Sequence, residues 1–497
     1  MGDITSKPVV LRRRKSAFDE LGYKETIQEL IQEVIALYRS DAIPWVIGYS
    51  GGKDSTAVLQ LVWLALLKME HSELTKPVHV ISTDTMVENP VVAAWVANSL
   101  KEINRAAEKD RLPLLAHRLT PRIEDSFWVN LIGKGYPAPR PMFRWCTERL
   151  KIRPSNQFIK DLVKQNGEAI LILGTRKAES SARASRMKAL EDKRVRDRLS
   201  PNSSLPNSLV FSPIEDWSND DVWLFLMQQK NPWGYNNHEL LAMYRGASED
   251  NECPLVVDTS TPSCGDSRFG CWVCTMVEQD KSMSAMIQND EEKAWMTPLL
   301  QLRDSLDVAN DRHLRDFRRM DGRVQLFHDS TVPGPYTQSA RAEWLRRLLS
   351  AQVQIQKTGP TEVANIELIT LEELREIRRI WLEDKHEFED LVPEIYQAEI
   401  GESFPSSTME DRRVLGSEEL RILRDLHPDD PLLFEMVRSL IDIEWRFQSM
   451  SRRHGLYEEL EKTIRRSFYD DESDAIDRAR TVFEAKNGLP HSQNGEE

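Results

Sequence analysis

The sequence predicts an α/β protein built on a doubly wound, mostly parallel sheet, followed by a cysteine-rich segment and a helical C-terminal domain. Apolar segments typical of strands alternate with amphipathic helix patterns over the first half of the chain. A turn with two glycines follows the first of these strands directly and opens a helix. Four of the five cysteines lie between residues 251 and 275, and the pattern after about residue 290 is helical.

Five strands and five helices make up the expected α/β part. The strands are predicted at 45–49, 77–82, 112–119, 169–173 and 209–214, and the helices at 16–39, 56–69, 90–107, 147–165 and in a stretch that ends at Met227 after a cap at Ser218. Further helices are expected around 299–306, 340–353, 371–381 and 431–450. The predicted domains are a flexible basic tail over 1–15, the α/β domain over 16–230, a cysteine-rich cluster-binding segment over 231–290, a helical domain over 291–480 and a flexible tail over 481–497.

Composition restricts the class of protein. No apolar run approaches the roughly 18 residues of a membrane helix, and no apolar stretch follows the arginines at 12–14, so neither a membrane protein nor a secretory signal is expected. Five cysteines in 497 residues do not make a disulfide framework and fit a cytoplasmic protein with metal or redox chemistry. The net charge of −14 argues against a general nucleic-acid coat protein.

The loop Ser50-Gly51-Gly52-Lys53-Asp54-Ser55 has the character of an anion site. Its glycines allow positive φ and a close backbone approach, and the helix that follows would point N–H groups at a bound phosphate. Lys53 adds a positive charge, whereas Asp54 fits beside a phosphate only if it binds Mg²⁺ or fixes the loop. The spacing matches neither G-x-x-x-x-G-K-[ST] nor G-x-G-x-x-G. An ordinary strand-to-helix connection is the alternative.

Two further groups of polar residues follow predicted strands. Asp84 comes after the second strand, and Gly174, Arg176 and Arg183 follow the fourth. The carboxyl ends of parallel strands share one edge of a sheet, so all of them are predicted to lie near the glycine loop. A carboxylate here could reach a ribose or adenine, and arginines suit phosphate. The alternatives are a turn or N-cap role for Asp84 and a solvated helix face for the arginines.

The cysteines suggest a metal centre. Cys271 and Cys274 form a C-x₂-C pair, Cys264 precedes it by seven residues, and Cys146 is predicted at a helix start, capped by Thr147, where a thiolate is favoured. Four thiolates can hold zinc or an iron–sulfur cluster. We assign Cys146, Cys264, Cys271 and Cys274 as ligands, with Cys253 as the alternative. Buried, unliganded cysteines remain possible.

Charge is distributed unevenly along the chain. Residues 136–198 contain sixteen Lys or Arg against seven Asp or Glu, an excess of nine positive charges, which leaves −23 for the rest. This segment predicts contact with a polyanion such as DNA or RNA. The alternative is a solvated loop, because residues 191–206 are polar and rich in turn formers.

Taken together, these motifs resemble the phosphoadenylylsulfate (PAPS) reductase branch of the PP-loop ATP pyrophosphatases, an adenine nucleotide alpha hydrolase-like fold, over about residues 40–230. The motifs are the S-G-G-K-D-S loop, Thr83-Asp84-Thr85, Arg144-Trp145-Cys146-Thr147 and Gly174-Thr175-Arg176 with Glu179, Ser180 and Arg183. Assimilatory reductases usually carry paired cysteines where this chain has Trp145-Cys146, and they place a catalytic cysteine near the C-terminus, where this chain has none. The helical extension and residues 263–274 resemble the DndC family, the sulfurtransferases of bacterial DNA phosphorothioation.

This resemblance implies a function and its cofactors. The enzyme would bind Mg²⁺ and ATP, release pyrophosphate, adenylate a DNA phosphate oxygen and replace a non-bridging oxygen by sulfur. Partners would be DNA, a cysteine desulfurase as sulfur donor and other proteins of the phosphorothioation system, and the four cysteines would hold a [4Fe–4S] cluster. Lys53, Asp54 and Arg176 would be catalytic, and ATP would be held by Ser50, Gly51, Gly52, Lys53, Asp54, Ser55, Asp84, Gly174, Arg176 and Arg183. The alternatives are a sulfonucleotide reductase or tRNA thiolase on the same fold, and a non-catalytic metal scaffold.

Overall fold

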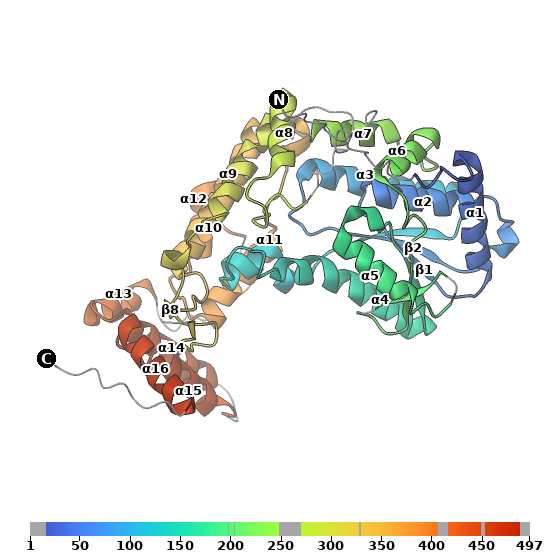
Figure 1. Cartoon of the computed structure of the whole chain (residues 1–497). Helices are drawn as coiled ribbons and strands as arrows, with labels where there is room; N and C mark the ends of the chain where they lie inside the picture. Colours follow the sequence, from blue (N-terminus) through green and yellow to red (C-terminus); the bar gives the residue numbers. More distant parts are fainter. Residues whose placement is uncertain are drawn as a thin grey trace, which may run out of the picture. The chain divides into compact units, whose positions relative to one another are not determined.

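The computed structural model describes residues 16–196, 198–202, 204–247, 270–327, 330–405, 416–448 and 453–487. The chain divides into two compact units (Figure 1). Unit 1 comprises Met1–Pro121 and Arg144–Leu300, and unit 2 comprises Arg122–Phe143 and Gln301–Glu497. The segment 122–143 therefore packs with the C-terminal helices, although the sequence places it inside the α/β domain.

Unit 1 contains the predicted sheet, which confirms the fold class. Its six strands follow the order β3-β2-β1-β4-β6-β5, and all pairs are parallel except β5 with β6. The strands are β1 Trp45–Gly48, β2 Val78–Thr83, β3 Leu114–Leu119, β4 Ala169–Ile172, β5 Ser200–Pro201 and β6 Ser208–Phe211. The strand order reverses between β1 and β4, and ligands of doubly wound sheets bind at such a point.

Helices cover both faces of this sheet, because its strands are apolar on both sides. Trp45 and Ile47 of β1 belong to the larger hydrophobic core, and Val46 between them belongs to a second core with Ile159 and Leu162 of α4. The helices of unit 1 are α1 Tyr23–Arg39, α2 Lys53–Leu66, α3 Pro90–Lys109, α4 Arg153–Asn166, α5 Ser181–Glu191, α6 Asn219–Gln228, α7 Asn237–Gly246 and α8 Lys281–Asn289, and α9 Thr297–Leu306 crosses into unit 2. Short 3₁₀ helices are η1 His71–Glu73, η5 Lys177–Glu179 and η6 Glu291–Met296.

Some predicted boundaries are wrong. Helix α2 begins at Lys53 rather than at Thr56, so its first turn belongs to the glycine loop. The helix predicted from Thr147 already contains Cys146, continues as the π-helix η4 Thr147–Ile152 and then joins α4. Thr147 is therefore not an N-cap. Part of the region read as polar and turn-rich is ordered in β5, and α5 was not predicted.

Unit 2 is helical around its own core. Its helices are the π-helices η3 Val129–Gly133 and η9 Ile380–Asp384 with α10 Gln338–Thr358, α11 Leu371–Arg379, α12 Leu391–Ile400, α13 Ser417–Leu426, α14 Pro431–Gln448, α15 Leu456–Arg466 and α16 Glu472–Asn487. Short elements are the 3₁₀ helices η2 Ile123–Asp125, η7 Arg312–Leu314 and η8 Thr361–Val363 and the strands β7 Leu326–Phe327 and β8 Ser330–Thr331. Trp128 Nε1 donates to Leu368 O at 2.8 Å and Trp381 Nε1 donates to Ile132 O at 3.0 Å, which ties 122–143 to this unit. No helix in the described ranges has the length and apolar character that a membrane crossing requires.

Candidate nucleotide loop and cysteine site

The glycine loop joins β1 to α2 through a backbone that only small residues allow. Gly51 has φ +73°, and a Cβ there would lie 2.5 Å from Cγ2 of Val96 on α3. Gly52 precedes α2 and would bring a Cβ to 3.0 Å from the hydroxyl of Tyr244 on α7. The loop is thus enclosed by α3 and α7, and the first turn of α2 begins at Lys53, as an anion site of this kind requires.

Two serines and a tyrosine fix the shape of the loop. Ser55 Oγ donates to Gly52 O at 3.0 Å and accepts from Ser50 N at 3.2 Å. The hydroxyls of Ser50 and Ser55 are 3.2 Å apart. Lys53 N donates to the Tyr244 hydroxyl at 3.3 Å, and burial raises the pKa of Tyr244. No local sequence pattern points to Tyr244, which lies 191 residues from Lys53.

Asp54 binds two cations rather than standing alone. One carboxylate oxygen lies 3.2 Å from Lys53 Nζ and the other lies 2.7 Å from Arg176 Nε. Arg176 is only 4% exposed and also donates to Trp217 O at 3.2 Å. Of the two roles expected for Asp54, fixing the loop is the one that these contacts describe. Arg176 follows β4, and its guanidinium connects this segment to Asp54 of the glycine loop.

Gly174 lets the segment after β4 touch the nucleotide loop. A Cβ at this position would lie 2.9 Å from the backbone carbonyl carbon and oxygen of Asp54 and 3.2 Å from Ser55 N. Such contacts are too short for any other residue, so glycine is required for β4 and α2 to approach this closely. The prediction that the 174–176 segment lies beside the loop is therefore supported by direct geometry.

The other two predicted binding residues are bound to protein groups. Asp84 forms an Asx turn, with Oδ1 accepting from Met86 N at 2.7 Å, and its other oxygen pairs with Arg118 of β3. This is the turn role named as the alternative for Asp84. Arg183 lies in the first turn of α5, where its guanidinium pairs with Glu179 and its backbone N–H donates to Ser180 Oγ.

Residues 270–274 pack against the loop that follows β2. Asn89 N donates to Gly270 O at 3.3 Å and Trp272 N donates to Val87 O at 3.0 Å. Cys271 Sγ lies 3.3 Å from Thr85 Oγ1, and Cys274 N donates to Cys271 O at 3.1 Å. The C-x₂-C pair therefore lies next to the N-terminus of α3. Cys253 and Cys264 lie outside the described residues.

Cys146, Cys271 and Cys274 come together around Lys151. All three cysteines influence the pKa of Lys151, which is raised, with Cys271 as the largest cause, and Lys151 Nζ lies 3.6 Å from Glu88 Oε1. Burial raises the pKa of Cys271 to about 12 and also raises that of Cys146, with a contribution from Cys274. The pKa of Cys146 is thus shifted in the direction opposite to the one that a helix start favours, because burial outweighs the helix end.

The three thiols near Lys151 are candidate ligands of an iron–sulfur cluster. No group of three or more His, Cys, Asp or Glu side chains within the described ranges could hold a metal ion. A cluster spreads its irons and sulfides between the ligand sulfurs, so its ligands stand farther apart than those of one ion. A bound iron would also deprotonate the thiols. Cys146, Cys271 and Cys274 would supply three of the ligands.

Carboxylates from elsewhere in unit 1 neutralise part of the basic segment 136–198. Arg176 pairs with Asp54, Lys151 with Glu88, Arg194 with Glu215, Arg196 with Asp41 and Arg198 with Glu33. Lys177 lies within 4 Å of three acidic side chains, those of Glu191, Glu215 and Asp216. The positive field of this segment is therefore weaker than its composition predicts.

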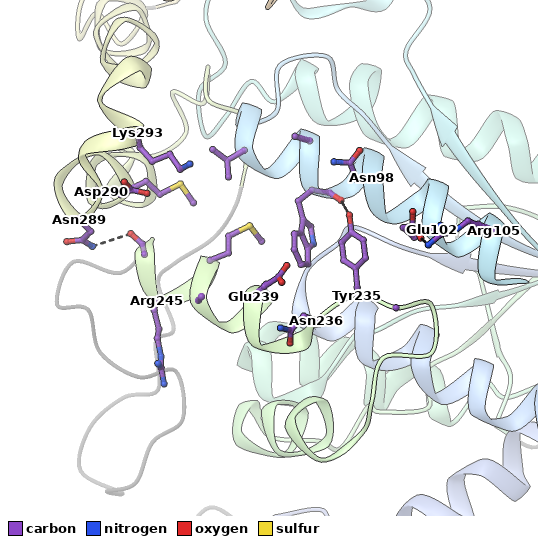
Figure 2. A pocket seen from close by; sticks show the side chains of 18 residues that line it. Asn98, Glu102, Arg105, Tyr235, Asn236, Glu239, Arg245, Asn289, Asp290 and Lys293 are labelled. Carbon is purple, nitrogen blue, oxygen red and sulfur yellow. Dashed lines mark hydrogen bonds and ion pairs between the residues drawn. The ribbon is translucent and has the colours of Figure 1, made fainter. Parts of the chain in front are cut away.

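A pocket of about 1080 Å³ is lined by residues of α3, α7 and α8 (Figure 2). Helices α3 and α7 are also the two that enclose the glycine loop. Trp95 and Met243 line it, whereas the next residues, Val96 and Tyr244, face the loop. Its aromatic wall is held by Tyr235, whose hydroxyl donates to Trp95 O at 3.2 Å (Figure 2). None of the predicted site residues lines this pocket, so it is separate from the nucleotide loop.

Known proteins resemble the part of the chain that contains the glycine loop and the C-x₂-C pair. Residues 44–276 match the family model of the phosphoadenosine phosphosulfate reductase domain. An uncharacterized protein of Methanocaldococcus jannaschii is 26% identical over 252 residues, which cover 51% of this chain and 40% of that protein. The chain thus spans less than half the length of this relative.

A solved structure also aligns with this chain. It is the U34-tRNA thiolase NcsA from Methanococcus maripaludis with its [4Fe-4S] cluster, which is 14% identical and covers 57% of this chain and 79% of its own, with a TM-score of 0.28.

Proposed function

We propose that the phosphoadenosine phosphosulfate reductase-like domain at residues 44–276 serves an ATP-dependent sulfurtransferase that modifies DNA phosphates, as in the DndC family. One observation carries this proposal: the nucleotide loop and the cysteine site both rest on the start of α3. Asn89, the N-cap of α3, bonds to Gly270, and Val96 packs on Gly51. Seven residues of helix separate them, about 10 Å. An activated phosphate at the loop would lie within reach of sulfur held near the cysteines.

The first half-reaction transfers AMP. A non-bridging oxygen of the DNA phosphodiester attacks the α-phosphorus of ATP, a P–O bond forms and pyrophosphate leaves with the electrons of the broken bond. Lys53 and the N-terminus of α2 bind the departing charge, and Ser50 and Ser55 orient it. The Asp54–Arg176 pair holds the loop in place for this step. Mg²⁺ would be bound together with ATP.

The second half-reaction replaces oxygen by sulfur. A sulfur atom at the oxidation level of sulfide attacks the adenylated DNA phosphorus, a P–S bond forms and AMP leaves with the former phosphate oxygen. The [4Fe–4S] cluster would supply the sulfur-binding chemistry of the site. Cys146, Cys271 and Cys274 would bind that cluster, and Lys151 with Glu88 would set the charge beside it. A cysteine desulfurase is the proposed source of sulfur. It delivers the atom as a persulfide, and a thiol reductant such as dithiothreitol, included in the assay, supplies the two electrons that release it as sulfide and is oxidised to a disulfide.

The test uses anaerobically purified full-length protein with Mg-ATP, cysteine and a cysteine desulfurase. Duplex DNA, transfer RNA and PAPS are offered separately, with and without the other proteins of the phosphorothioation system. Pyrophosphate release is measured, and mass spectrometry of nuclease digests detects phosphorothioate linkages or thiolated bases. Lys53→Met is the inactive control, because it removes the charge at the loop.

We expect phosphorothioate in DNA and pyrophosphate release that depends on DNA. Thiolated transfer RNA, or sulfite formed from PAPS, would replace the proposal by one of its alternatives. A reductase would need a redox cysteine besides the cluster ligands, and Cys253 is the cysteine that remains for it. Pyrophosphate release that Lys53→Met leaves unchanged would show that the loop is not catalytic.

A further inference from the structure

Unit 2 contains a cluster of cations that has no role in the chemistry described above. Arg318 and Arg341 are 3% and 2% exposed. Lys385, at the C-terminal end of η9, and Arg466, the last residue of α15, are half-buried. Lys385 and Arg466 have no hydrogen-bond or ion-pair partner for their charged groups among the residues that the structure describes. Buried cations are normally paired, so this arrangement needs an explanation.

The neighbouring carboxylates are already bound by other guanidinium groups. Asp316 accepts from Arg318 Nε at 2.9 Å and from Arg318 Nη2 at 2.7 Å. Glu435 accepts from the same Arg318 Nη2 at 2.8 Å, and Glu387 pairs with Arg341. Counting Arg318, Arg341, Lys385 and Arg466 against Asp316, Glu387 and Glu435, the cluster has four cations and three carboxylates.

Lys385 and Arg466 are influenced by some of the same charged side chains. Burial lowers the pKa of Lys385 to about 7, and the charges of Arg341 and Arg466 lower it further, whereas Glu387 and Asp316 act in the opposite direction. Burial likewise lowers the pKa of Arg466, which Asp316 and Glu387 also influence. Asp316 and Glu387 therefore act on both cations, and the charge of Arg466 acts on Lys385.

The surroundings of Arg466 and Arg341 constrain both side chains. The side-chain stem of Arg466 packs on Gly322, which has φ +81° and where a Cβ would lie 2.7 Å from the Cβ and Cγ atoms of Arg466. Arg318 Nη1 donates to Arg466 O at 3.2 Å, which fixes the end of α15. Arg341 Nη1 is buried and has no hydrogen-bond partner within the described ranges. Arg341 Nη1 therefore has a donor N–H available in the part of unit 2 that also contains Lys385 and Arg466.

We propose that Lys385 and Arg466, supported by Arg341, form an anion site that binds one phosphate group, and that its source is the backbone of the nucleic acid on which unit 1 acts. A guanidinium and an ammonium together match the oxygens of a phosphate. The nucleic-acid source rests on the proposed function, whereas the phosphate site does not. The basic segment 136–198 is partly neutralised, so a phosphate contact from unit 2 would add to the contacts that unit 1 offers.

The experiment compares Lys385→Met and Arg466→Met in the full-length protein. The matched control is Arg465→Met, which removes the same charge from the neighbouring, 77% exposed position on α15. Inorganic phosphate is titrated calorimetrically. Binding of a fluorescent DNA duplex is then measured by anisotropy over a range of salt concentrations, and thermal unfolding is followed for every variant.

We expect phosphate binding to weaken at least about tenfold in Lys385→Met and Arg466→Met, because a charge-assisted hydrogen bond is lost. DNA binding should weaken as well, and the slope of log K against log salt should fall by about 0.9 for one lost phosphate contact. Arg465→Met should change neither by more than about twofold. Lys385→Met should also raise the Tm, because it removes an unpaired, half-buried charge. A purely structural role for Lys385 predicts a lower Tm instead.

Two outcomes would overturn the proposal in whole or in part. If the variants lose phosphate but bind DNA normally, the site takes free phosphate or a small phosphorylated molecule, and the nucleic-acid source is wrong. If wild-type protein binds no phosphate and the variants bind DNA normally, the site does not exist. The proposed function is tested separately, by pyrophosphate release and by Lys53→Met in unit 1. Failure of the site at Lys385 and Arg466 can therefore be distinguished from failure of the proposed function.

Discussion

The carboxylate of Asp54 connects the two segments that form the nucleotide loop. It lies between Lys53 and Arg176, and Arg176 is almost fully buried. We expect Asp54→Asn to lower the free energy of unfolding by about 3 kcal/mol, because it leaves a buried guanidinium without its carboxylate. Urea denaturation of the full-length protein measures this change.

A double variant provides the control for this pair. Asp54→Asn with Arg176→Met removes both charges, so it should unfold at a higher urea concentration than Asp54→Asn alone. Equal midpoints for the wild type and Asp54→Asn would mean that the pair contributes nothing to stability and that Asp54 is available to bind a metal.

Gly174 is the second residue on which the loop depends. In Gly174→Ala the added methyl would meet the Asp54 carbonyl at 2.9 Å, so β4 and α2 must move apart. We expect a loss of about 1–3 kcal/mol in stability, from overpacking, and at least about tenfold slower pyrophosphate release, because misplacement by about 1 Å is costly in catalysis. Gly246→Ala is the control, because a Cβ there meets nothing within 4 Å. Equal activity of both variants would show that the close approach is not needed.

A spectroscopic experiment can distinguish the cysteines that bind the proposed cluster from those that do not. Anaerobically purified protein should be brown, with a broad absorbance band near ~400 nm and with iron and acid-labile sulfide. Cys146→Ser should lose the band, because Cys146 converges with Cys271 and Cys274 on Lys151. Cys253→Ser should keep it. The opposite result would make Cys253 the ligand, and colourless protein containing one zinc would exclude the cluster.

The local sequence pattern was sufficient to predict the central strands, because each strand is a short apolar run bounded by polar or turn-forming residues. It also located the glycine loop, whose conformation is encoded by neighbouring residues. The π-helix at Thr147–Ile152 was missed, since its apolar spacing does not differ from that of an α-helix over one turn. It places Cys146 and Lys151 near one another across a widened turn.

Long-range pairing explains what the sequence could not predict in the site. Asp84 binds Arg118 because the register of β2 with β3 sets Ser82 opposite Arg118, and no local motif records that register. Arg176 looked available for phosphate, but its partner Asp54 lies on another segment. The excess charge of 136–198 was real, yet carboxylates distant in sequence neutralise part of it.

A histidine pair between β2 and β3 gives a prediction at the level of elements. His79 Nδ1 lies 3.1 Å from His117 Nε2, and Phe158 of α4 packs on both rings. Burial lowers the pKa of both histidines, and the charge of His117 lowers that of His79 further. The unfolded chain therefore binds protons more readily than the native protein below about pH 6.5. Stability is highest when both rings are neutral and falls as the pH decreases through this region.

We accordingly expect the urea midpoint to fall between pH 7.5 and pH 5.5. His117→Gln should flatten this dependence, because it removes one of the two groups that resist protonation. His71→Gln, at an exposed position in η1, serves as the control and should keep the wild-type dependence. A steep dependence in His117→Gln would assign the effect to other groups.

On the scale of the whole molecule, each unit has its own core and each carries its own proposed ligand. The proposed ligand of unit 1 is a nucleotide at the glycine loop, and that of unit 2 is a phosphate at Lys385 and Arg466. A ligand that binds only folded protein stabilises the unit that holds it, by about 2.7 kcal/mol at a concentration of 100 Kd. Calorimetry of the full-length protein should therefore show two transitions that respond to different ligands.

We expect a non-hydrolysable ATP analogue with Mg²⁺ to raise the Tm of one transition by about 5–10 °C and inorganic phosphate to raise the other by a similar amount. Gly174→Ala should lower the first transition alone, and Lys385→Met should raise the second and abolish its response to phosphate. These variants assign each transition to its unit without separating the chain. A single transition that both ligands shift equally would mean that the units unfold together, and a phosphate response confined to the first transition would place the anion in the nucleotide loop.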